Sequence, residues 1–452
     1  MNQQVASTIE ADPDGSLSMR EVFARWWPLG LSWLLMAVAL PATNAVIARL
    51  PEARTQLAAW GSIVLPISLV IEAPVIMMLA ASTALCDSKS SYDRLWRFMM
   101  GLGAALTVIH GLIAFTPLFD VVVGGWMNAP ERMKPPARIG LCIMTPWTWA
   151  IAHRRFYQGI LIRYGYPKSV GVGTLVRITV ISGILGYGWW AGSSSGMVIG
   201  ATANTAGAVI EMLFIRGWVQ RVLTRQYGSP STGDNREPLS WMRLARFYVP
   251  LSLTSILTMA VEPVIGAGLL RLPRPVDSAA IWPVTRGLLF VMYSTGMAYK
   301  EVVVSLLDRT NPVPALRRFT FILFGIVTGL LVLTAATPLS TFWFYTFTGL
   351  DQELIPLARE SLWFGVLIPG FIAVSNWYQG VVVYNERTWP IIESMALFLV
   401  TLLLGVGGGI LLDTYAGLYV ALGAYTVGRL VQVLWLWFRS RDIVRRLLYR
   451  NE

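Results

Sequence analysis

Charged residues inside long apolar stretches are the positions in this sequence best suited to chemistry. Arginine and lysine bind carboxylate or phosphate groups, whereas glutamate binds protons or cations. The basic residues in such stretches are Arg177, Arg286, Lys300 and Arg429. The acidic ones are Glu72, Glu211, Glu262, Glu301 and, nearer to a stretch end, Glu393. Because burying a charge among apolar groups is costly, each of these residues is a functional candidate.

Two of the glutamates lie beside prolines. Glu262 directly precedes Pro263, and Glu72 lies between Pro66 and Pro74. A proline inside a helix frees a backbone carbonyl and bends the helix, so polarity is already exposed at these positions. We therefore predict that Glu262 and Glu72 act as coupling or gating carboxylates. The alternative for each is a structural ion pair with a neighbouring arginine.

Arg286 and Arg429 are the leading candidates for binding an anionic substrate. Each is central in an apolar stretch, and Arg286 has no acid within one helical turn. Its guanidinium suits a carboxylate or phosphate, and the alternative is a salt bridge to Glu262. Lys300 and Glu301 follow Arg286 by about four helical turns. Because adjacent residues diverge by about 100° around a helix, only one of the two can face the same cavity as Arg286.

The remaining candidates are weaker. Arg177 and His110 are predicted coupling residues. The alternative for Arg177 is that its side chain snorkels to the membrane surface, and the alternative for His110 is a packing role with a hydrogen-bonded ring. Asn44 and Asn376 are predicted to line a cavity, and Glu211 is predicted to be structural. Cys86 and Cys142 lack metal-ligand spacing, and no nucleotide loop or nucleophile motif occurs. The sequence therefore predicts neither an enzyme nor a metal or other cofactor.

The elements that position these residues are membrane-spanning helices. The chain has 452 residues, of which 55% are hydrophobic and 13% charged, and a mean hydropathy of +0.57. Soluble domains carry about 25% charged residues, so this composition excludes an ordinary soluble globule. Windows of about 20 apolar residues number about twelve. They lie near residues 27–49, 58–85, 96–117, 138–158, 169–191, 196–218, 245–270, 279–307, 318–340, 360–381, 390–412 and 415–438.

The chain has a net charge of +11, and the distribution of its basic residues indicates how the spans are oriented. One face collects about 24 basic residues, including Arg154, Arg155, Arg317 and Arg318, whereas the other collects about 8. Positive residues stay on the cytoplasmic side, so both termini are predicted to be cytoplasmic. The basic charge does not indicate nucleic-acid binding. Arg441, Arg445, Arg446 and Arg450 form a basic tail suited to anionic lipid headgroups.

An internal repeat divides the chain into two halves. Pro28, Pro41, Arg49 and Trp60 recur as Pro250, Pro263, Arg271 and Trp282 (250 − 28 = 222). After one deletion, Thr116-Pro117-Leu118 recurs as Thr337-Pro338-Leu339 and Tyr157-Gln158-Gly159 as Tyr378-Gln379-Gly380 (378 − 157 = 221). Six spans per half is an even number, so the repeats are parallel. The repeated prolines Pro28, Pro41, Pro250 and Pro263 are predicted hinges.

This organisation predicts five segments. They are a cytoplasmic N-terminal segment (1–25), an N-lobe (26–219), a cytoplasmic linker (220–242), a C-lobe (243–438) and a basic cytoplasmic tail (439–452).

Twelve spans in two parallel six-helix halves, each opened by a proline-bent helix, resemble the multidrug/oligosaccharidyl-lipid/polysaccharide (MOP) exporter superfamily. Three stretches resemble its progressive ankylosis (ANK) family: Val108–Phe115, Tyr299-Lys300-Glu301 with Asp308–Pro312, and Trp27-Pro28-Leu29. The superfamily resemblance implies a MATE-like fold of two V-shaped lobes and alternating access. The ANK resemblance implies export of a small organic anion such as citrate, a nucleotide or pyrophosphate. MATE-type drug antiporters often carry an acid in the first span, and residues 27–49 contain none.

The sequence is compatible with three functions. The first is export of a small organic anion by a secondary transporter, with H⁺ or Na⁺ left open as coupling ion. The second is a cation-coupled multidrug exporter of the MATE type, in which Glu262 binds the proton. The third is a flippase for a lipid-linked oligosaccharide. In each case we expect a monomer in the plasma (inner) membrane, in contact with lipid and without nucleic acid.

Overall fold

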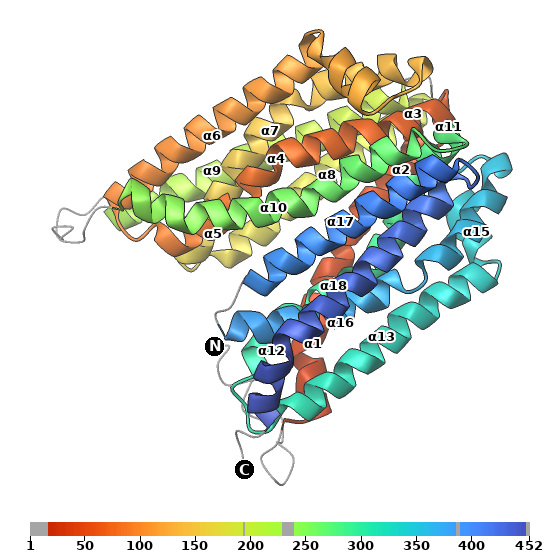
Figure 1. The fold of residues 1–452 in the computed structure, drawn as a ribbon. Helices are drawn as coiled ribbons and strands as arrows, with labels where there is room; N and C mark the ends of the chain where they lie inside the picture. Colours follow the sequence, from red (N-terminus) through yellow and green to blue (C-terminus); the bar gives the residue numbers. More distant parts are fainter. Residues whose placement is uncertain (1–16, 193–194, 228–238, 386–388, 449–452) are drawn as a thin grey trace. The chain divides into compact units, whose positions relative to one another are not determined.

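A computed structural model describes residues 17–192, 195–227, 239–385 and 389–448 of the chain (Figure 1). Within these residues every regular element is a helix, as the sequence predicted. Residues 1–16 of the predicted N-terminal segment, 228–238 of the linker and 449–452 of the tail lie outside the described residues.

The first half of the chain contains α1 (Met19–Ala37), α2 (Ala39–Ile47), α3 (Ala53–Ala59), η2 (Trp60–Val64), α4 (Leu65–Ile76), α5 (Met78–Leu85), α6 (Lys89–Phe115), η3 (Asp120–Trp126), η4 (Glu131–Met133), α7 (Lys134–Arg163), α8 (Pro167–Ala191) and α9 (Gly196–Tyr227). The second half contains α10 (Trp241–Leu269), α11 (Pro275–Met297), α12 (Tyr299–Leu306), α13 (Pro312–Ala336), α14 (Leu339–Thr341), η5 (Phe342–Phe347), η6 (Gln352–Leu354), α15 (Ile355–Gly365), α16 (Ile368–Tyr384), α17 (Trp389–Leu412) and α18 (Gly417–Leu448).

Nine helical stretches among the described residues are long and apolar enough to cross a membrane. They coincide with nine of the predicted windows. The other three windows, 27–49, 138–158 and 279–307, also fold as helices, namely α1 with α2, α7, and α11 with α12. The first and last of these are interrupted, at Val38 and Ala298, so their separate helices are shorter than the predicted windows.

Helix bounds repeat along the chain at the offset seen in the sequence. The stretch from the start of α1 to the end of α2 (19–47) matches α10 (241–269) at an offset of 222 (241 − 19 = 222). Beyond the deletion, α9 (196–227) matches α18 (417–448) at an offset of 221 (417 − 196 = 221). Even the N-terminal caps recur, because Ser18 and Ser240 accept hydrogen bonds from Glu21 N (3.2 Å) and Arg243 N (3.1 Å). The two halves therefore share one helical plan.

Helix crossings recur as well. Gly159 on α7 packs against Ser82 on α5, and a Cβ at position 159 would collide with the Ser82 hydroxyl. Gly380 on α16 packs against Val303 on α12, where a Cβ would lie 2.6 Å from Val303 Cγ1. The glycine of the repeated Tyr-Gln-Gly motif is therefore needed for close helix packing in both halves.

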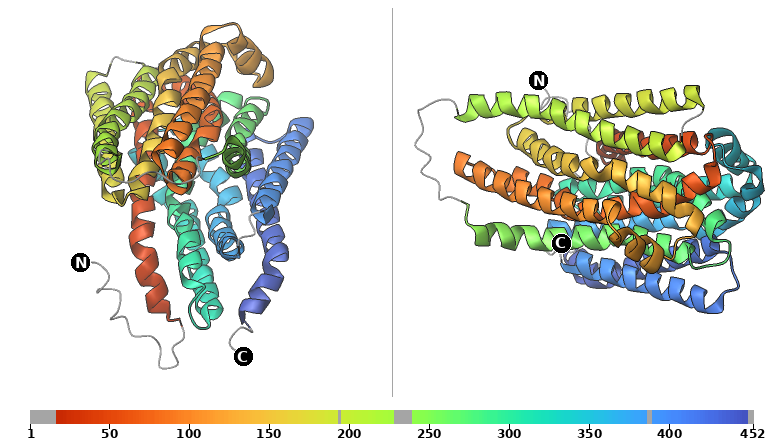
Figure 2. Two further views of the ribbon diagram at one scale, coloured as in Figure 1. Left: turned by 90° about the vertical axis from the view of Figure 1, so that its left-hand side faces the viewer. Right: turned by 90° about the horizontal axis from the view of Figure 1, so that it is seen from above.

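The described helices form two compact units that differ from the predicted lobes. Unit 1 comprises residues 1–42 and 284–452, and unit 2 comprises residues 43–283. Thus α1 belongs with the second half of the chain and α10 with the first. In unit 2, the long axes of α6, α7, α9 and α10 are roughly aligned (Figures 1 and 2). Which helices move together remains a prediction from the sequence.

Polar contacts explain how the opening helix of each half is held. In unit 1, Trp26 Nε1 on α1 donates to the Thr295 carbonyl (2.9 Å), and Glu21 pairs with Arg309 (2.6 Å). In unit 2, the Tyr248 hydroxyl on α10 donates to the carbonyl of Pro74 (2.6 Å). Each opening helix is therefore anchored to helices of the other sequence half.

The four predicted hinge prolines have different local effects. The turn at Val38 separates α1 from α2 and lies three residues before Pro41, as expected because Pro41 has no N–H to donate to the preceding turn. Pro263, its equivalent, lies inside the continuous helix α10 together with Pro250, and Pro28 lies inside α1. Only Pro41 adjoins a break in its helix, and hinge motion at any of the four remains a prediction.

Candidate functional site

A charged cluster lies inside unit 2 and joins three helices. Glu211 on α9 pairs with Arg154 Nη1 on α7 at 2.8 Å and with Arg177 Nε on α8 at 3.4 Å. The second carboxylate oxygen of Glu211 accepts a hydrogen bond from Gln158 Nε2 at 3.2 Å. Glu211 is 0% exposed and Arg154 7%. Because a buried carboxylate requires compensating charge, this arrangement holds α7, α8 and α9 together.

Two more charged side chains complete this group, which we call the Glu211 cluster: Glu72, Arg154, Arg155, Gln158, Arg177 and Glu211. Glu72 on α4 is buried, and the charges of Arg154, Arg155 and Arg177 act on it. Its Oε2 has no hydrogen-bond partner among the described residues. Arg155 reaches the Gln158 side-chain oxygen at 3.4 Å. Three guanidinium groups therefore face two carboxylates inside the bundle.

A second polar group, in unit 1, surrounds Arg429 on α18. Arg429 donates to the Gln432 side-chain oxygen and to the Tyr425 hydroxyl, both at 2.7 Å. Its guanidinium carbon lies 4.3 Å from the ring centroid of Phe398 on α17 and 4.9 Å from that of Tyr425. We call Arg429, Tyr425, Gln432 and Phe398 the Arg429 cage. Within the described residues no carboxylate forms an ion pair with Arg429, and its Nε has no hydrogen-bond partner.

The two groups occupy related places in the repeat. Gln432 is the equivalent of Glu211 (432 − 211 = 221), and Phe398 is the equivalent of Arg177 (398 − 177 = 221). The first half thus has a carboxylate and an arginine where the second half has an amide and an aromatic ring. The single arginine of the second group comes from α18 itself.

Other predicted substrate residues lie apart from these groups. Arg286 is half-buried on α11, and Lys300 is half-buried on α12 beside the exposed Glu301. Lys300 and Glu301 thus differ in exposure, and which of them faces a cavity remains a prediction. Glu262 is buried on α10. Both Arg286 and Glu262 have interaction partners.

The predicted cavity asparagines bind backbone carbonyls. Asn44 Nδ2 donates to the Pro283 carbonyl at 2.8 Å, and Asn376 Nδ2 donates to the Gly296 carbonyl at 3.0 Å. Gly296 lies just before the interruption between α11 and α12, where carbonyl acceptors are left over. Both amides therefore donate to backbone carbonyls of α11, one inside the helix and one near its end, which is a structural use of their N–H donors.

His110 is fully buried between α6 and α7. Its Nδ1 lies 2.8 Å from the Thr148 hydroxyl, whereas Nε2 has no hydrogen-bond partner among the described residues. This geometry fits hydrogen-bonded packing and leaves one ring nitrogen available. His110 is not part of the Glu211 cluster as its contacts define it.

The sequence did not identify Arg154, Arg155 and Gln158 as functional candidates. It placed Arg154 and Arg155 on the cytoplasmic face, because the apolar window ends near residue 158. The helix α7 instead continues to Arg163, so Arg154 lies more than two turns inside it and is buried against Glu211. The available signal was Glu211 itself, an apolar-flanked acid that needs a buried basic partner.

The described residues contain no group of three or more His, Cys, Asp or Glu side chains able to hold a metal ion. The arrangements present are guanidinium–carboxylate pairs and a guanidinium–aromatic cage. Such groups bind ions and form alternate salt bridges.

Comparisons with known proteins identify the fold. Neither a family model nor a curated protein matches the sequence. Among solved structures, an inward-facing multidrug resistance MATE family transporter of the MOP superfamily aligns with TM-score 0.70 at 15% identity, over 94% of this chain and 99% of the other. The lipid II flippase MurJ in an inward closed conformation aligns with TM-score 0.68 at 12% identity, covering 94% and 90% of the two chains.

A third structure is a MOP superfamily transporter from Pyrococcus furiosus, described as having a binding pocket of reversed polarity that suggests a different function. It aligns with TM-score 0.61 at 16% identity, over 96% of this chain and 97% of the other. These matches show that the chain has the fold of MATE-like transporters of the MOP superfamily, and nine helices among its described residues are long and apolar enough to cross a membrane.

Proposed function

We propose that this protein is a secondary active transporter that exports a small organic anion by alternating access. The observation that carries the proposal is the Arg429 cage. A guanidinium deep in a membrane helix is costly unless its charge is balanced. The contacts of Arg429 to Gln432, Tyr425 and Phe398 are all with neutral groups. A carboxylate or phosphate of the substrate would supply the missing negative charge.

The chemistry of the cage suits reversible binding. Aromatic rings stabilise a desolvated cation by about 2 kcal/mol or more, but they leave its positive charge without a counter-ion. Tyr425 and Gln432 hold the guanidinium in place through single hydrogen bonds, so other donors of its fork remain for a substrate. A permanent carboxylate partner would instead compete with the substrate.

The Glu211 cluster supports the same substrate charge. Its three arginines exceed its two glutamates, so unit 2 also carries positive charge within its helices. Arg286 and Lys300 remain proposed substrate ligands. Asn44 and Asn376 become weaker ones, because their amide donors bind carbonyls. Glu72, Glu262, Glu301, Arg177 and His110 remain proposed coupling or gating residues.

The comparisons support an anion only indirectly. The transporter from Pyrococcus furiosus is described by reversed pocket polarity, so this fold accommodates pockets of differing charge. The ANK resemblance narrows the substrate to the citrate, nucleotide or pyrophosphate class. We further propose a monomer in the plasma (inner) membrane with both termini cytoplasmic, from the distribution of basic residues.

The test is transport of labelled citrate, ATP and pyrophosphate in proteoliposomes, under imposed pH and Na⁺ gradients. We expect Arg429→Gln to reduce transport of the accepted anion at least about tenfold, since it removes the charge and keeps a polar side chain that can donate hydrogen bonds. Arg439→Gln is the matched control, because Arg439 lies on the same helix but pairs with Glu393 at 2.9 Å. Full transport by Arg429→Gln would refute the assignment.

A cation-coupled multidrug exporter is the second candidate. The observation that favours it is Glu72, a buried carboxylate with one oxygen lacking a hydrogen bond among the described residues. Such an oxygen is available to a proton. Efflux of cationic drugs by the same proteoliposomes, with no response to the three anions, would select this function.

A further inference from the structure

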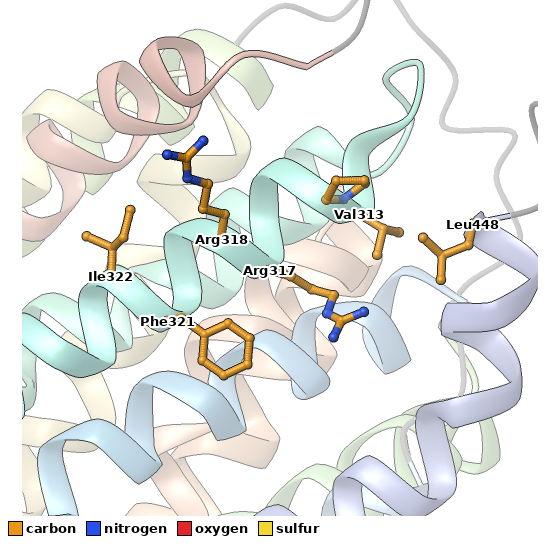
Figure 3. A pocket seen from close by; sticks show the side chains of 7 residues that line it. Val313, Arg317, Arg318, Phe321, Ile322 and Leu448 are labelled. Atoms are coloured by element: carbon orange, nitrogen blue, oxygen red, sulfur yellow. The ribbon is translucent and has the colours of Figure 1, made fainter.

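A groove lies on unit 1, where α13 begins and α18 ends (Figure 3). It has a volume of about 560 Å³. Its walls combine basic and apolar side chains, namely Val313, Pro314, Arg317, Arg318, Phe321, Ile322 and Leu448. None of these side chains belongs to the Glu211 cluster or to the Arg429 cage.

The two arginines of this groove are not balanced by acids. Arg317 and Arg318 are exposed, and within the described residues neither forms an ion pair or donates a hydrogen bond. Arg445 precedes Leu448 by three residues on α18, so it lies on the same side of that helix. Among the described acids, the nearest in sequence are Asp308 and Asp442, which already contact Tyr384 and Arg441. The described residues of the groove therefore carry net positive charge.

On each of two sides of α13, an arginine is followed one helical turn later by an apolar residue. Phe321 follows Arg317 by one helical turn, and Ile322 follows Arg318 by one turn, so each arginine is succeeded on its own side by an apolar residue. Figure 3 shows Arg317 and Phe321 on one side of the helix and Arg318 and Ile322 on another. Phe321 is 64% exposed and Ile322 42%. Both lie in a helix apolar enough to span the membrane.

We propose that this groove binds an anionic phospholipid. Its headgroup phosphate lies on Arg317 and an acyl chain over Phe321, one turn deeper on the same side of α13, whereas Arg318 and Ile322 add positive charge and apolar surface on the adjoining side. Basic pockets at the cytoplasmic side of membrane helices bind such headgroups, and the distribution of basic residues assigns this end of α13 to the cytoplasm. A soluble anion would use the arginines alone. The exposed apolar residues one turn deeper match only a ligand that continues into the bilayer.

The test is a binding titration of the full-length protein in neutral detergent with phosphatidylglycerol, phosphatidylcholine and inorganic phosphate. Native mass spectrometry counts bound lipid, and thermal unfolding gives the stabilisation by each ligand. We expect phosphatidylglycerol to bind about tenfold more tightly than phosphatidylcholine. The double variant R317Q/R318Q should abolish that preference, whereas F321A should weaken binding of both lipids by a similar factor.

The matched control is R221Q/R225Q. Arg221 and Arg225 lie at the predicted cytoplasmic end of α9 and are exposed, but they do not line the groove. We expect this variant to keep the preference for phosphatidylglycerol. An equal loss in R221Q/R225Q would overturn the proposal in favour of diffuse surface charge. So would binding of inorganic phosphate as tight as that of the lipid, which would indicate a soluble ligand. If R317Q/R318Q unfolds, R317K/R318K provides the comparison, and it should retain the preference in reduced form.

Discussion

Glu211 and Gln432 occupy equivalent positions in the two halves of the chain, yet only Glu211 carries a charge and only Glu211 is enclosed by arginines. At Glu211 two guanidinium groups arrive from neighbouring helices. At Gln432 one guanidinium arrives from the same helix and meets no carboxylate among the described residues. The same arrangement of helices thus contains an ion-pair cluster in unit 2 and, in unit 1, an arginine without a carboxylate partner among the described residues.

Removing the charge of Glu211 should destabilise unit 2. Glu211→Gln leaves the buried Arg154 and the half-buried Arg177 without their carboxylate, and loss of one partner of a buried ion pair costs roughly 3–5 kcal/mol. We expect a clear drop in the thermal unfolding temperature of the purified protein. Gln432→Ala is the control at the equivalent position, since it removes only neutral contacts. If Glu211→Gln unfolds at the wild-type temperature, the cluster does not stabilise the unit.

Adding a carboxylate at the equivalent position should stop anion transport. In Gln432→Glu the new carboxylate would lie where the amide oxygen now accepts from Arg429 at 2.7 Å, so it would neutralise the guanidinium. We expect a folded protein with at least about tenfold lower transport of the accepted anion. Gln432→Leu separates charge from shape, and it should retain more transport than Gln432→Glu. Unchanged transport by Gln432→Glu would exclude Arg429 as the anion ligand.

Much of the fold follows from features that act locally along the sequence. Apolar windows set the helices, and the repeated Pro41 and Pro263, or Thr116-Pro117 and Thr337-Pro338, set the register of the repeat. These signals depend on residue type and spacing alone. For this reason the all-helical fold and the two-fold repetition were predictable.

The polar contacts were less predictable because they depend on where helices end and meet. Arg154 was placed at a membrane surface because the apolar window stops near residue 158, whereas α7 continues to Arg163. Asn44 and Asn376 were predicted to line a cavity, and in the structure their amides bind carbonyls of α11. Neither the interruption at Ala298 nor the grouping of α1 with the second half is encoded in local spacing.

The repeated glycines should be intolerant of a side chain. Gly380→Ala would bring a Cβ to 2.6 Å from Val303 Cγ1, and the backbone carbonyl of Lys300 at 3.1 Å blocks a simple adjustment. We expect a lower unfolding temperature than that of the wild type. The control is Gly407→Ala on α17, where no atom lies within 4 Å of the added Cβ. That change should be neutral or stabilising by about 0.5–1 kcal/mol, because alanine favours the helix. A stable Gly380→Ala would show that α12 and α16 can separate without cost.

The last prediction concerns coupling at Glu72. The side chain is buried, and its Oε2 has no hydrogen-bond partner among the described residues. Glu72→Gln keeps its size, so we expect the variant to fold. The same change removes the site at which a proton can bind near Arg154 and Arg155. Stimulation of transport by a pH gradient in proteoliposomes should therefore disappear, while exchange at equal pH on both sides continues. Glu360→Gln is the control, because Glu360 is an exposed glutamate of α15 and is not among the proposed coupling residues. Retained pH-gradient stimulation in Glu72→Gln would exclude Glu72 as the coupling residue, and Glu262→Gln would then be the next variant to measure.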